Sequence, residues 1–162
     1  MKFHSLELLG SICSELRAGG SKVVLAHGCF DVFTIGHANH LRAARKLGDC
    51  LVVTVTPDRF ISKGHGRPIF HEGTRAEMIS TLACVDYVAI NQWPDAVNTI
   101  KFLRPSFYCK GGEFKEWMTA ALTLEQEAVE SIGGKLVFTD CQEYHTTETL
   151  ERLCKSSLQQ PT

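Results

Sequence analysis

The chain has 162 residues, of which 44% are hydrophobic and 22% are charged, and this length and composition are typical of one compact globular domain. The formal net charge of −1 gives no general positive field for nucleic acid, and no apolar run reaches the roughly eighteen residues of a membrane span. We therefore expect a single domain over 1–162, with a helix over 3–18 and a core over 20–158, and neither nucleic acid nor a membrane as a partner.

Helical and strand patterns alternate along the chain. Short β-branched and apolar runs predict strands at 22–28, 49–56, 85–90, 106–112 (with its exit loop) and 135–139. Apolar residues spaced three and four apart predict helices at 3–17, 37–47, 74–83, 94–103, 114–131 and 145–158. Because the connections are short, the alternation predicts an α/β fold, namely a Rossmann-like, doubly wound sheet of five parallel strands with helices on both faces.

Two of the expected helices show an apolar stripe in the sequence. In the first helix the stripe consists of Leu6, Leu9, Cys13 and Leu16. In the helix over 114–131 it consists of Trp117, Ala121, Leu124 and Ala128. Glu7 and Glu15 interrupt the apolar pattern of the first sixteen residues, which favours an amphipathic helix over a signal peptide.

Seven cysteines occur in the sequence, and their pattern favours reduced thiols over disulfides or a zinc site. Their number is odd, no CxxC pair occurs, and most of them lie within apolar runs. We therefore expect a cytoplasmic protein.

Polar clusters follow four of the five expected strands. They read HGCFD after the first strand, TPDRFISKGHGR after the second, KGGEF after the fourth and CQEYHTT after the fifth. In open parallel sheets, ligands bind beyond the carboxyl ends of the strands, where the strand order changes direction. Four clusters that share glycine, lysine, histidine and threonine indicate one anionic ligand at this edge.

The glycine-containing turn after the first strand is the clearest candidate for a phosphate site. Gly28 permits close approach of the backbone, and Gly36 and His37 begin a helix whose free N–H groups favour phosphate oxygens. The turn contains neither the GxxxxGK[ST] loop nor the GxGxxG fingerprint. Taken alone, it is equally compatible with an ordinary strand–helix connection that carries incidental histidines.

The wider sequence resembles a known superfamily. The stretch GCFDVFTIGH resembles the signature of the nucleotidyltransferases with a (T/H)xGH motif. The stretches ARKLGDCLVVTVTPD, KGHGRP, RAEMISTLACVDYV, RPSFYCKGGEF and GGKLVFT follow in register and resemble the cytidylyltransferase-like branch. Within that branch the heptose-1-phosphate adenylyltransferases are the most similar, and the resemblance covers about residues 20–150.

The resemblance implies an enzyme that transfers a nucleotidyl group. A phosphate monoester would attack the α-phosphorus of ATP or CTP, and pyrophosphate would leave. Catalysis of this kind depends on charge stabilisation and in-line placement, with little covalent chemistry by the protein. The implied cofactor is Mg²⁺, bound mainly through the triphosphate and with no protein ligand assigned, and the implied assembly is a homodimer.

The resemblance also implies roles for individual residues. His37 would hold the α- and β-phosphates and stabilise the transition state. The implied catalytic residues are Thr34, His37, Lys63 and Arg75. The implied nucleotide-binding residues are Gly28, Cys29, Phe30, Asp31, Gly36, His40, Lys110, Gly111, Gly112, Thr146 and Thr147. The expected contacts of the acceptor substrate are Asp58, Arg59 and Lys63.

Two departures from the family pattern leave the substrate open. Thr34 stands where the commoner motif has a histidine, and EYHTT replaces the usual run near the fifth strand. His40 lies one turn beyond His37 on the same helical face and is a candidate for the missing donor, although a surface histidine is the alternative. The leading function is a heptose-1-phosphate adenylyltransferase. The alternatives are a CTP-dependent cytidylyltransferase for a polyol phosphate, such as glycerol 3-phosphate, and a non-catalytic nucleotide-binding module.

Overall fold

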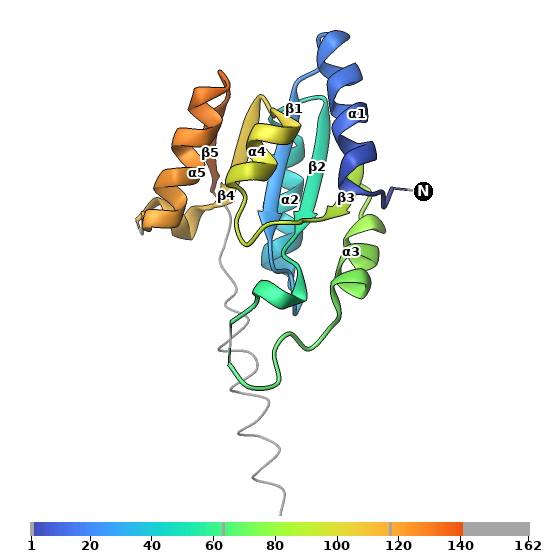
Figure 1. The fold of residues 1–162 in the computed structure, drawn as a ribbon, viewed down its shortest axis with the longest axis vertical. Coiled ribbons are helices and arrows are strands. Elements are labelled where there is room, and N and C mark those ends of the chain that lie inside the picture. The colour runs from blue at the N-terminus through green and yellow to red at the C-terminus, as the bar shows by residue number, and fades with distance from the viewer. Residues whose placement is uncertain (1, 63, 117, 141–162) are drawn as a thin grey trace, which may run out of the picture.

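A computed structural model describes residues 2–62, 64–116 and 118–140 (Figure 1). Its five strands form one parallel sheet in the order β3-β2-β1-β4-β5. The strands are β1 (Val23–Gly28), β2 (Cys50–Val55), β3 (Tyr87–Ile90), β4 (Phe107–Gly111) and β5 (Lys135–Thr139). The predicted Rossmann-like parallel sheet is confirmed, and all five expected strands are present.

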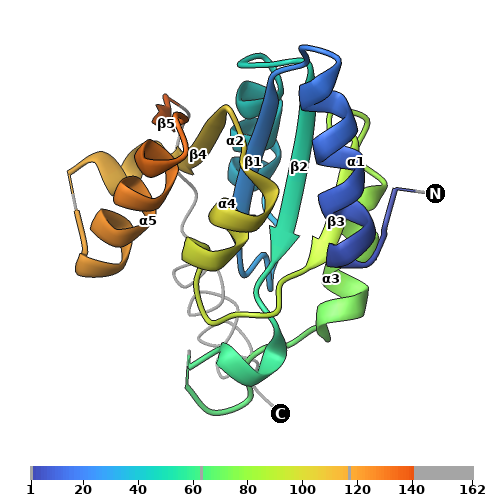
Figure 2. The ribbon, with the colours of Figure 1, turned by 45° about the horizontal axis from the view of Figure 1, so that its top comes forward.

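Helices cover both faces of this sheet (Figure 2). They are α1 (Leu6–Ala18), α2 (Ile35–Arg45), α3 (Glu72–Ser80), α4 (Val97–Leu103) and α5 (Ala120–Ser131). Two short 3₁₀ turns occur at Asp58–Phe60 and Gly112–Lys115. The helix expected over 145–158 lies outside the described residues.

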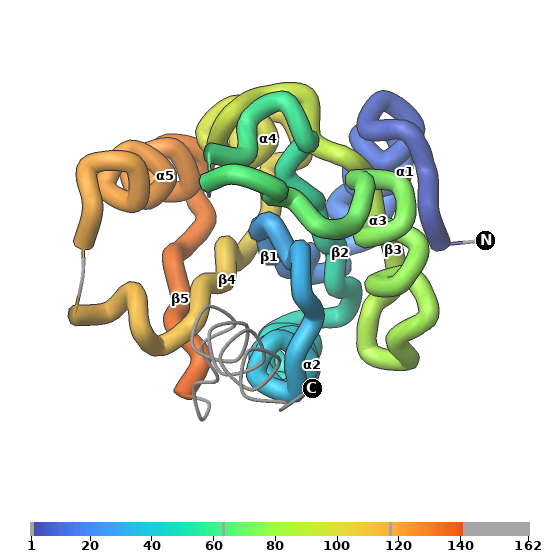
Figure 3. The backbone as a smooth tube through the Cα atoms, turned by 90° about the horizontal axis from the view of Figure 1, so that it is seen from below, coloured from blue at the N-terminus to red at the C-terminus, as the bar shows by residue number. Residues whose placement is uncertain are grey.

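The side chains of each strand alternate between two hydrophobic cores, as the pleat requires. In β1, Val23 and Leu25 pack with α1, α4 and α5, whereas Val24 and Ala26 pack with α2 and α3. Figure 3, which looks along the strands, shows α2 on one side of the sheet and α1, α4 and α5 on the other. The central strands are therefore buried on both faces, which explains their continuous apolar runs.

The apolar stripe expected for the fifth helix is confirmed at Ala128 and wrong at Ala121 and Leu124, and Trp117 lies outside the described residues. The helix begins at Ala120 instead of 114, because the hydroxyl oxygen of Thr119 accepts a hydrogen bond from the N–H of Leu122 and caps the first turn. Leu124 is 54% exposed, and Ala121 is exposed as well. The buried face consists of Leu122, Glu125, Ala128 and Val129. A carboxylate therefore lies on the face that packs against the sheet.

The first helix agrees with its sequence pattern, since Leu6, Leu9 and Cys13 are buried. The segment before it runs beside the edge strand β3. The N–H of Val88 donates to the carbonyl of Lys2 at 2.8 Å, and the N–H of His4 donates to the carbonyl of Val88 at 2.9 Å. This short parallel pairing covers backbone groups that an edge strand otherwise leaves open.

The five cysteines in the described part of the chain are all free thiols, as their pattern predicts. Burial raises the pKa of Cys13 to about 11 and that of Cys50 to about 12, so both thiols are protonated at neutral pH.

In the described part of the chain, no helix combines the length and the apolar character that crossing a bilayer requires.

The strand order changes direction between β1 and β4. From β1 the chain builds outward through β2 to β3, and it then returns to place β4 on the other side of β1. The carboxyl ends of β1 and β4 consequently lie side by side, with Ala26 opposite Cys109. This is the position at which parallel α/β sheets bind ligands.

Candidate active site

The turn between β1 and α2 begins at Gly28, at the carboxyl end of the central strand. Phe30 has a left-handed backbone with φ of +51°, and its ring is 6% exposed. A Cβ atom on Gly28 would lie 3.1 Å from this ring, which is tighter than ordinary contact. Glycine at 28 therefore allows the Phe30 ring to pack beneath the turn.

His37 is held in this turn by two aromatic rings and by Thr34. The ring centroids of Phe30 and Phe33 each lie 5.5 Å from that of the imidazole. The backbone N–H of Thr34 donates to Nδ1 of His37 at 3.0 Å, and the Thr34 hydroxyl lies 3.1 Å from the same nitrogen. Because a backbone N–H can only donate, Nδ1 is an acceptor, and the neutral imidazole carries its proton on Nε2.

Thr34 is also the residue before the first turn of α2, and His37 occupies the third helical position. The pair forms a capping box in which histidine replaces the usual glutamate or glutamine. The positive end of the helix dipole and the Nε2–H of His37 thus belong to one rigid turn, which includes Gly36. This arrangement suits the binding of phosphate oxygens, and Thr34 acts in it by orienting His37.

His40, one turn further along α2, lies against the end of β5. Its Nδ1 is 2.8 Å from the hydroxyl of Thr139, and that hydroxyl donates to the carbonyl of Lys110 at 3.3 Å. Burial, followed by the nearby charge of Lys110, lowers the pKa of His40 to about 4. At neutral pH His40 is uncharged and ties α2 to β4 and β5, so it does not replace the cationic donor that a histidine at 34 would offer.

His27, on β1, is a second histidine whose ring nitrogens lie next to threonine hydroxyls. Nδ1 of His27 is 2.9 Å from the hydroxyl of Thr54, and Nε2 is 3.2 Å from that of Thr56. Burial and the nearby charge of Lys110 lower the pKa of His27 to about 3. The two strands β1 and β2 are therefore joined at this edge by a neutral imidazole.

These two histidines predict a loss of stability in acid. Because their pKa values are lower in the folded protein than in the unfolded chain, the unfolded state binds more protons below about pH 6.5, and stability falls as the pH falls toward about 4. Urea unfolding at pH 7, 6 and 5 measures this slope. We expect the free energy of unfolding of His40→Asn to depend less on pH than that of the wild type. The control variant His65→Asn, in the exposed loop after β2, should keep the wild-type dependence. A wild-type dependence in His40→Asn would contradict the lowered pKa of His40.

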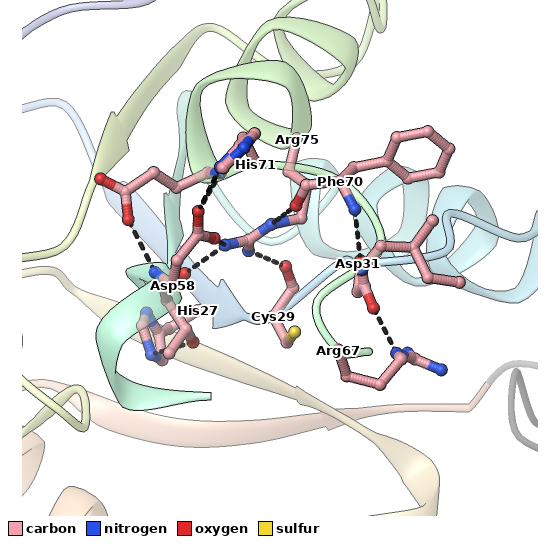
Figure 4. Close-up of polar contacts among 11 residues, drawn as sticks. His27, Cys29, Asp31, Asp58, Arg67, Phe70, His71 and Arg75 are labelled. Carbon is pink, nitrogen blue, oxygen red and sulfur yellow. Dashed lines mark hydrogen bonds and ion pairs between the residues drawn. The ribbon is translucent and has the colours of Figure 1, made fainter. Parts of the chain in front are cut away.

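Arg75 fixes the loops around the turn (Figure 4). It is fully buried, and its guanidinium donates to the carbonyls of Phe70 at 2.9 Å and Thr56 at 2.8 Å, to the carbonyl of Cys29, and to the carboxylate of Asp58 at 2.5 Å. We expected this arginine to bind phosphate. In the structure, the N–H groups of its guanidinium bind oxygen atoms of the protein instead, which favours a role in positioning the turn.

Asp31 provides a second connection between the turn and the segment after β2. Its carboxylate is 2% exposed and accepts from Nε of Arg67 at 2.5 Å and from the N–H groups of Ile69 and Phe70 at 2.7 and 3.0 Å. Asp31, which the resemblance places among the nucleotide-binding residues, thus orders the turn by binding residues 67–70.

Of the three expected acceptor contacts, Asp58 and Arg59 lie within the described residues, and they differ in their surroundings. Partial burial opposes ionisation of Asp58, but hydrogen bonds from Arg75 and His71 outweigh it, so the pKa of this carboxyl is below its ordinary value. Arg59 is exposed, donates to the carbonyl of Gln92 at 3.0 Å and lies 4.8 Å from the ring centroid of Phe60. Asp58 is bound to other residues of the protein, whereas Arg59 remains a candidate contact of the acceptor substrate.

Lys110 is the last residue but one of β4, which ends at Gly111, and Gly112 follows. Its Nζ lies 3.6 Å from the carboxylate of Glu125, and the ring centroid of Phe114 lies 4.5 Å away. A Cβ on Gly112 would lie 2.7 Å from the carbonyl oxygen of Thr139, so a larger residue would push β4 and β5 apart. An ammonium group is thus placed at the junction where the two halves of the sheet meet.

The comparisons with known proteins agree with this geometry. Residues 25–152 match the model of the cytidylyltransferase-like family. The chain belongs to the cytidylyltransferase-like family. The expectation of a cytidylyltransferase-like nucleotidyltransferase is therefore confirmed.

Several curated relatives of this cytidylyltransferase-like chain are bifunctional proteins. The chain is 34% identical to the bifunctional protein HldE of Geobacter sulfurreducens and 36% identical to that of Desulfatibacillum aliphaticivorans, covering 96% and 93% of this chain. It spans only 31% and 30% of those relatives. A solved structure, the lipopolysaccharide core biosynthesis protein of Thermoplasma volcanium, is 29% identical with a TM-score of 0.61, covering 78% of this chain and 100% of that one.

The structure brings together most of the expected residues of this cytidylyltransferase-like site at the carboxyl edge of the sheet. Lys63, Thr146 and Thr147 lie outside the described residues, so their roles stay predictions. Sequence reasoning missed Glu125, Tyr108 and the pair formed by His27 and Thr54. One signal was present for Glu125, because it stands three residues after Leu122 and three before Ala128, both of which are buried.

Proposed function

We propose that this protein transfers the AMP group of ATP to the phosphate of a heptose 1-phosphate and releases pyrophosphate. Family membership supports nucleotidyl transfer. The resemblance of its motifs to the heptose-1-phosphate adenylyltransferases, and the similarity to a lipopolysaccharide core biosynthesis protein, support the sugar phosphate. The curated relatives are about three times longer than the matched segment, so their full activities are not assumed for this chain.

The orientation of His37 is the single observation on which this proposal rests. Thr34 binds Nδ1 of His37, so the other ring nitrogen of the neutral imidazole is a donor. A donor of this kind suits the non-bridging oxygens of an α-phosphate, whose negative charge increases as the phosphorus becomes five-coordinate. The N-terminus of α2 adds its dipole to the same region.

The proposed reaction is an in-line displacement. A phosphate oxygen of the sugar phosphate forms a bond to the α-phosphorus, the bond from that phosphorus to the bridging oxygen of the β-phosphate breaks, and pyrophosphate leaves with the electron pair. An attacking phosphate needs no deprotonation, so the protein has to hold two anions together. His37 and Lys110 lie on opposite sides of the junction between β1 and β4 and are suited to this task.

We propose that Mg²⁺ accompanies the nucleotide and is held mainly by triphosphate oxygens. Within the described residues, no three His, Cys, Asp or Glu side chains are grouped so as to hold an ion. The metal would neutralise charge on the triphosphate, while the residues of this chain orient it.

Pyrophosphate release tests this function. The protein is incubated with each of ATP, CTP, GTP and UTP, paired with heptose 1-phosphate or glycerol 3-phosphate, in Mg²⁺ and again with excess EDTA. We expect release with ATP and heptose 1-phosphate, and loss of turnover with EDTA. Release only with CTP and glycerol 3-phosphate would favour the cytidylyltransferase alternative, and nucleotide binding without release from any pair would favour a non-catalytic module.

We also propose a homodimer, on the family resemblance alone. Light scattering measures this directly, because the monomer has a mass of 18.0 kDa. A monomer at working concentration would contradict the proposal without affecting the assignment of the reaction.

A further inference from the structure

Glu125 is a carboxylate on the buried face of α5, and it is 5% exposed. Its two oxygens have separate partners. Oε2 accepts from the hydroxyl of Tyr108 at 2.9 Å, and Oε1 accepts from the N–H of Ala96 at 3.2 Å. Because Ala96 immediately precedes α4, one side chain links α5, α4 and β4.

The third partner of Glu125 is Lys110. Its side chain is 14% exposed, and its ammonium lies 3.6 Å from Oε2, 4.5 Å from the ring centroid of Phe114 and 5.8 Å from that of Tyr108. A buried ammonium requires a counter-charge, and a flexible lysine loses considerable rotamer freedom when it is held in one place. Glu125 supplies the charge, and the two rings restrict the stem.

We propose that Glu125 is a positioning residue that acts through Lys110, by holding the ammonium in one place and directed toward the phosphates at the junction of β1 and β4. This inference rests on the proposed function. Glu125 itself would not touch substrate, because its oxygens are occupied by Tyr108, Ala96 and Lys110. Its contribution is to fix the position of the Lys110 ammonium.

The other ionisable groups around Lys110 do not replace this carboxylate. His27 on β1 and His40 on α2 are both near enough to be affected by the charge of Lys110, and both are neutral at pH 7. Tyr108 is held protonated, because burial and the Glu125 charge raise its pKa well above the ordinary value. Glu113, in the following 3₁₀ turn, is exposed. Of these described neighbours, Glu125 is the buried group that bears a negative charge.

The Glu125→Gln variant separates charge from shape. Its amide keeps the size of the side chain and offers both an acceptor and a donor to Tyr108 and Ala96, but it removes the counter-charge. The ammonium of Lys110 would then lack the ion pair that holds it in place. We expect the Kd for ATP, measured by calorimetry at neutral pH, to rise by about tenfold.

Two further variants make the test specific. Lys110→Met removes the ammonium and should also weaken ATP binding. The double variant Glu125→Gln with Lys110→Met should bind ATP as weakly as Lys110→Met alone, because a residue that acts only through Lys110 has no further effect once the ammonium is absent. Wild-type ATP affinity in Glu125→Gln or in Lys110→Met, or additive losses in the double variant, would overturn the proposal.

A readout without substrate distinguishes this inference from the proposed function. NMR relaxation of the Lys110 Cε–H groups, measured at one pH without ligand in the wild type and in Glu125→Gln, reports how firmly the ammonium is held. Greater mobility in the variant supports the positioning role even if no acceptor gives turnover, because the absence of turnover would contradict only the proposed reaction. Equal mobility overturns the positioning role whatever the activity.

Discussion

Replacing His37 by alanine is expected to lower kcat for pyrophosphate release by about 100-fold or more, because one oriented donor to a developing oxyanion is typically worth about that much. The fold should persist, since the strands and the core side chains of α2 are unaffected. The variant loses the Nε2–H donor together with the edge-on contact of Phe30 and the tilted contact of Phe33 with the imidazole. Initial rates at saturating ATP, with circular dichroism as a check on folding, measure the effect.

Two variants control this experiment. His37→Gln places an amide N–H near the position of Nε2 and should recover part of the lost rate, whereas His4→Ala, beside Tyr87 and far along the chain from the turn, should have wild-type turnover. Wild-type pyrophosphate release by His37→Ala would remove the main support for the proposed mechanism.

Replacing Arg75 by methionine is expected to destabilise the protein by about 3 kcal/mol or more, which corresponds to a fall in Tm of about 10 °C. The guanidinium is fully buried and has four protein acceptors, namely the carbonyls of Cys29, Thr56 and Phe70 and the carboxylate of Asp58. Methionine leaves these acceptors without their donors in a place that water reaches poorly. Thermal and urea unfolding measure the loss.

The matched control for Arg75→Met is Arg42→Met, because Arg42 is exposed on α2, where its guanidinium donates to the side chain of Asn39 at 3.2 Å. Arg42→Met should shift Tm by little. If Arg75→Met kept the wild-type Tm but lost affinity for ATP, the phosphate contact implied by the family resemblance would be correct and the positioning role would be wrong.

The strands were the most predictable part of the fold. The expected range 135–139 is the observed β5, and β1 and β2 differ from expectation by only one residue at their ends. Strands that are buried on both faces must be apolar at every position, so their signal is local and strong. Helix α1 was equally predictable, because its buried residues recur at helical spacing.

The site was predictable in position but not in its contacts. The strand order places the polar clusters at one edge, and the family motif identifies His37. The motif does not show that the donors of Arg75 are taken by backbone carbonyls, that Asp31 binds Arg67, or that His40 is neutral. These contacts join residues distant in the chain, and the sequence carries no periodic signal for them. The face of α5 was missed because a capping threonine, not the apolar spacing, sets where that helix begins.

The junction between β1 and β4 has a consequence for how the molecule holds together. Only three paired positions connect these strands, whereas six connect β1 to β2. This pairing has the fewest paired positions in the sheet, although α1, α4 and α5 share one core with β1 on one of its faces. A nucleotide bound across the ends of β1 and β4 would hold the two strands together, so substrate should slow sub-global opening and proteolytic cleavage as well as undergo reaction.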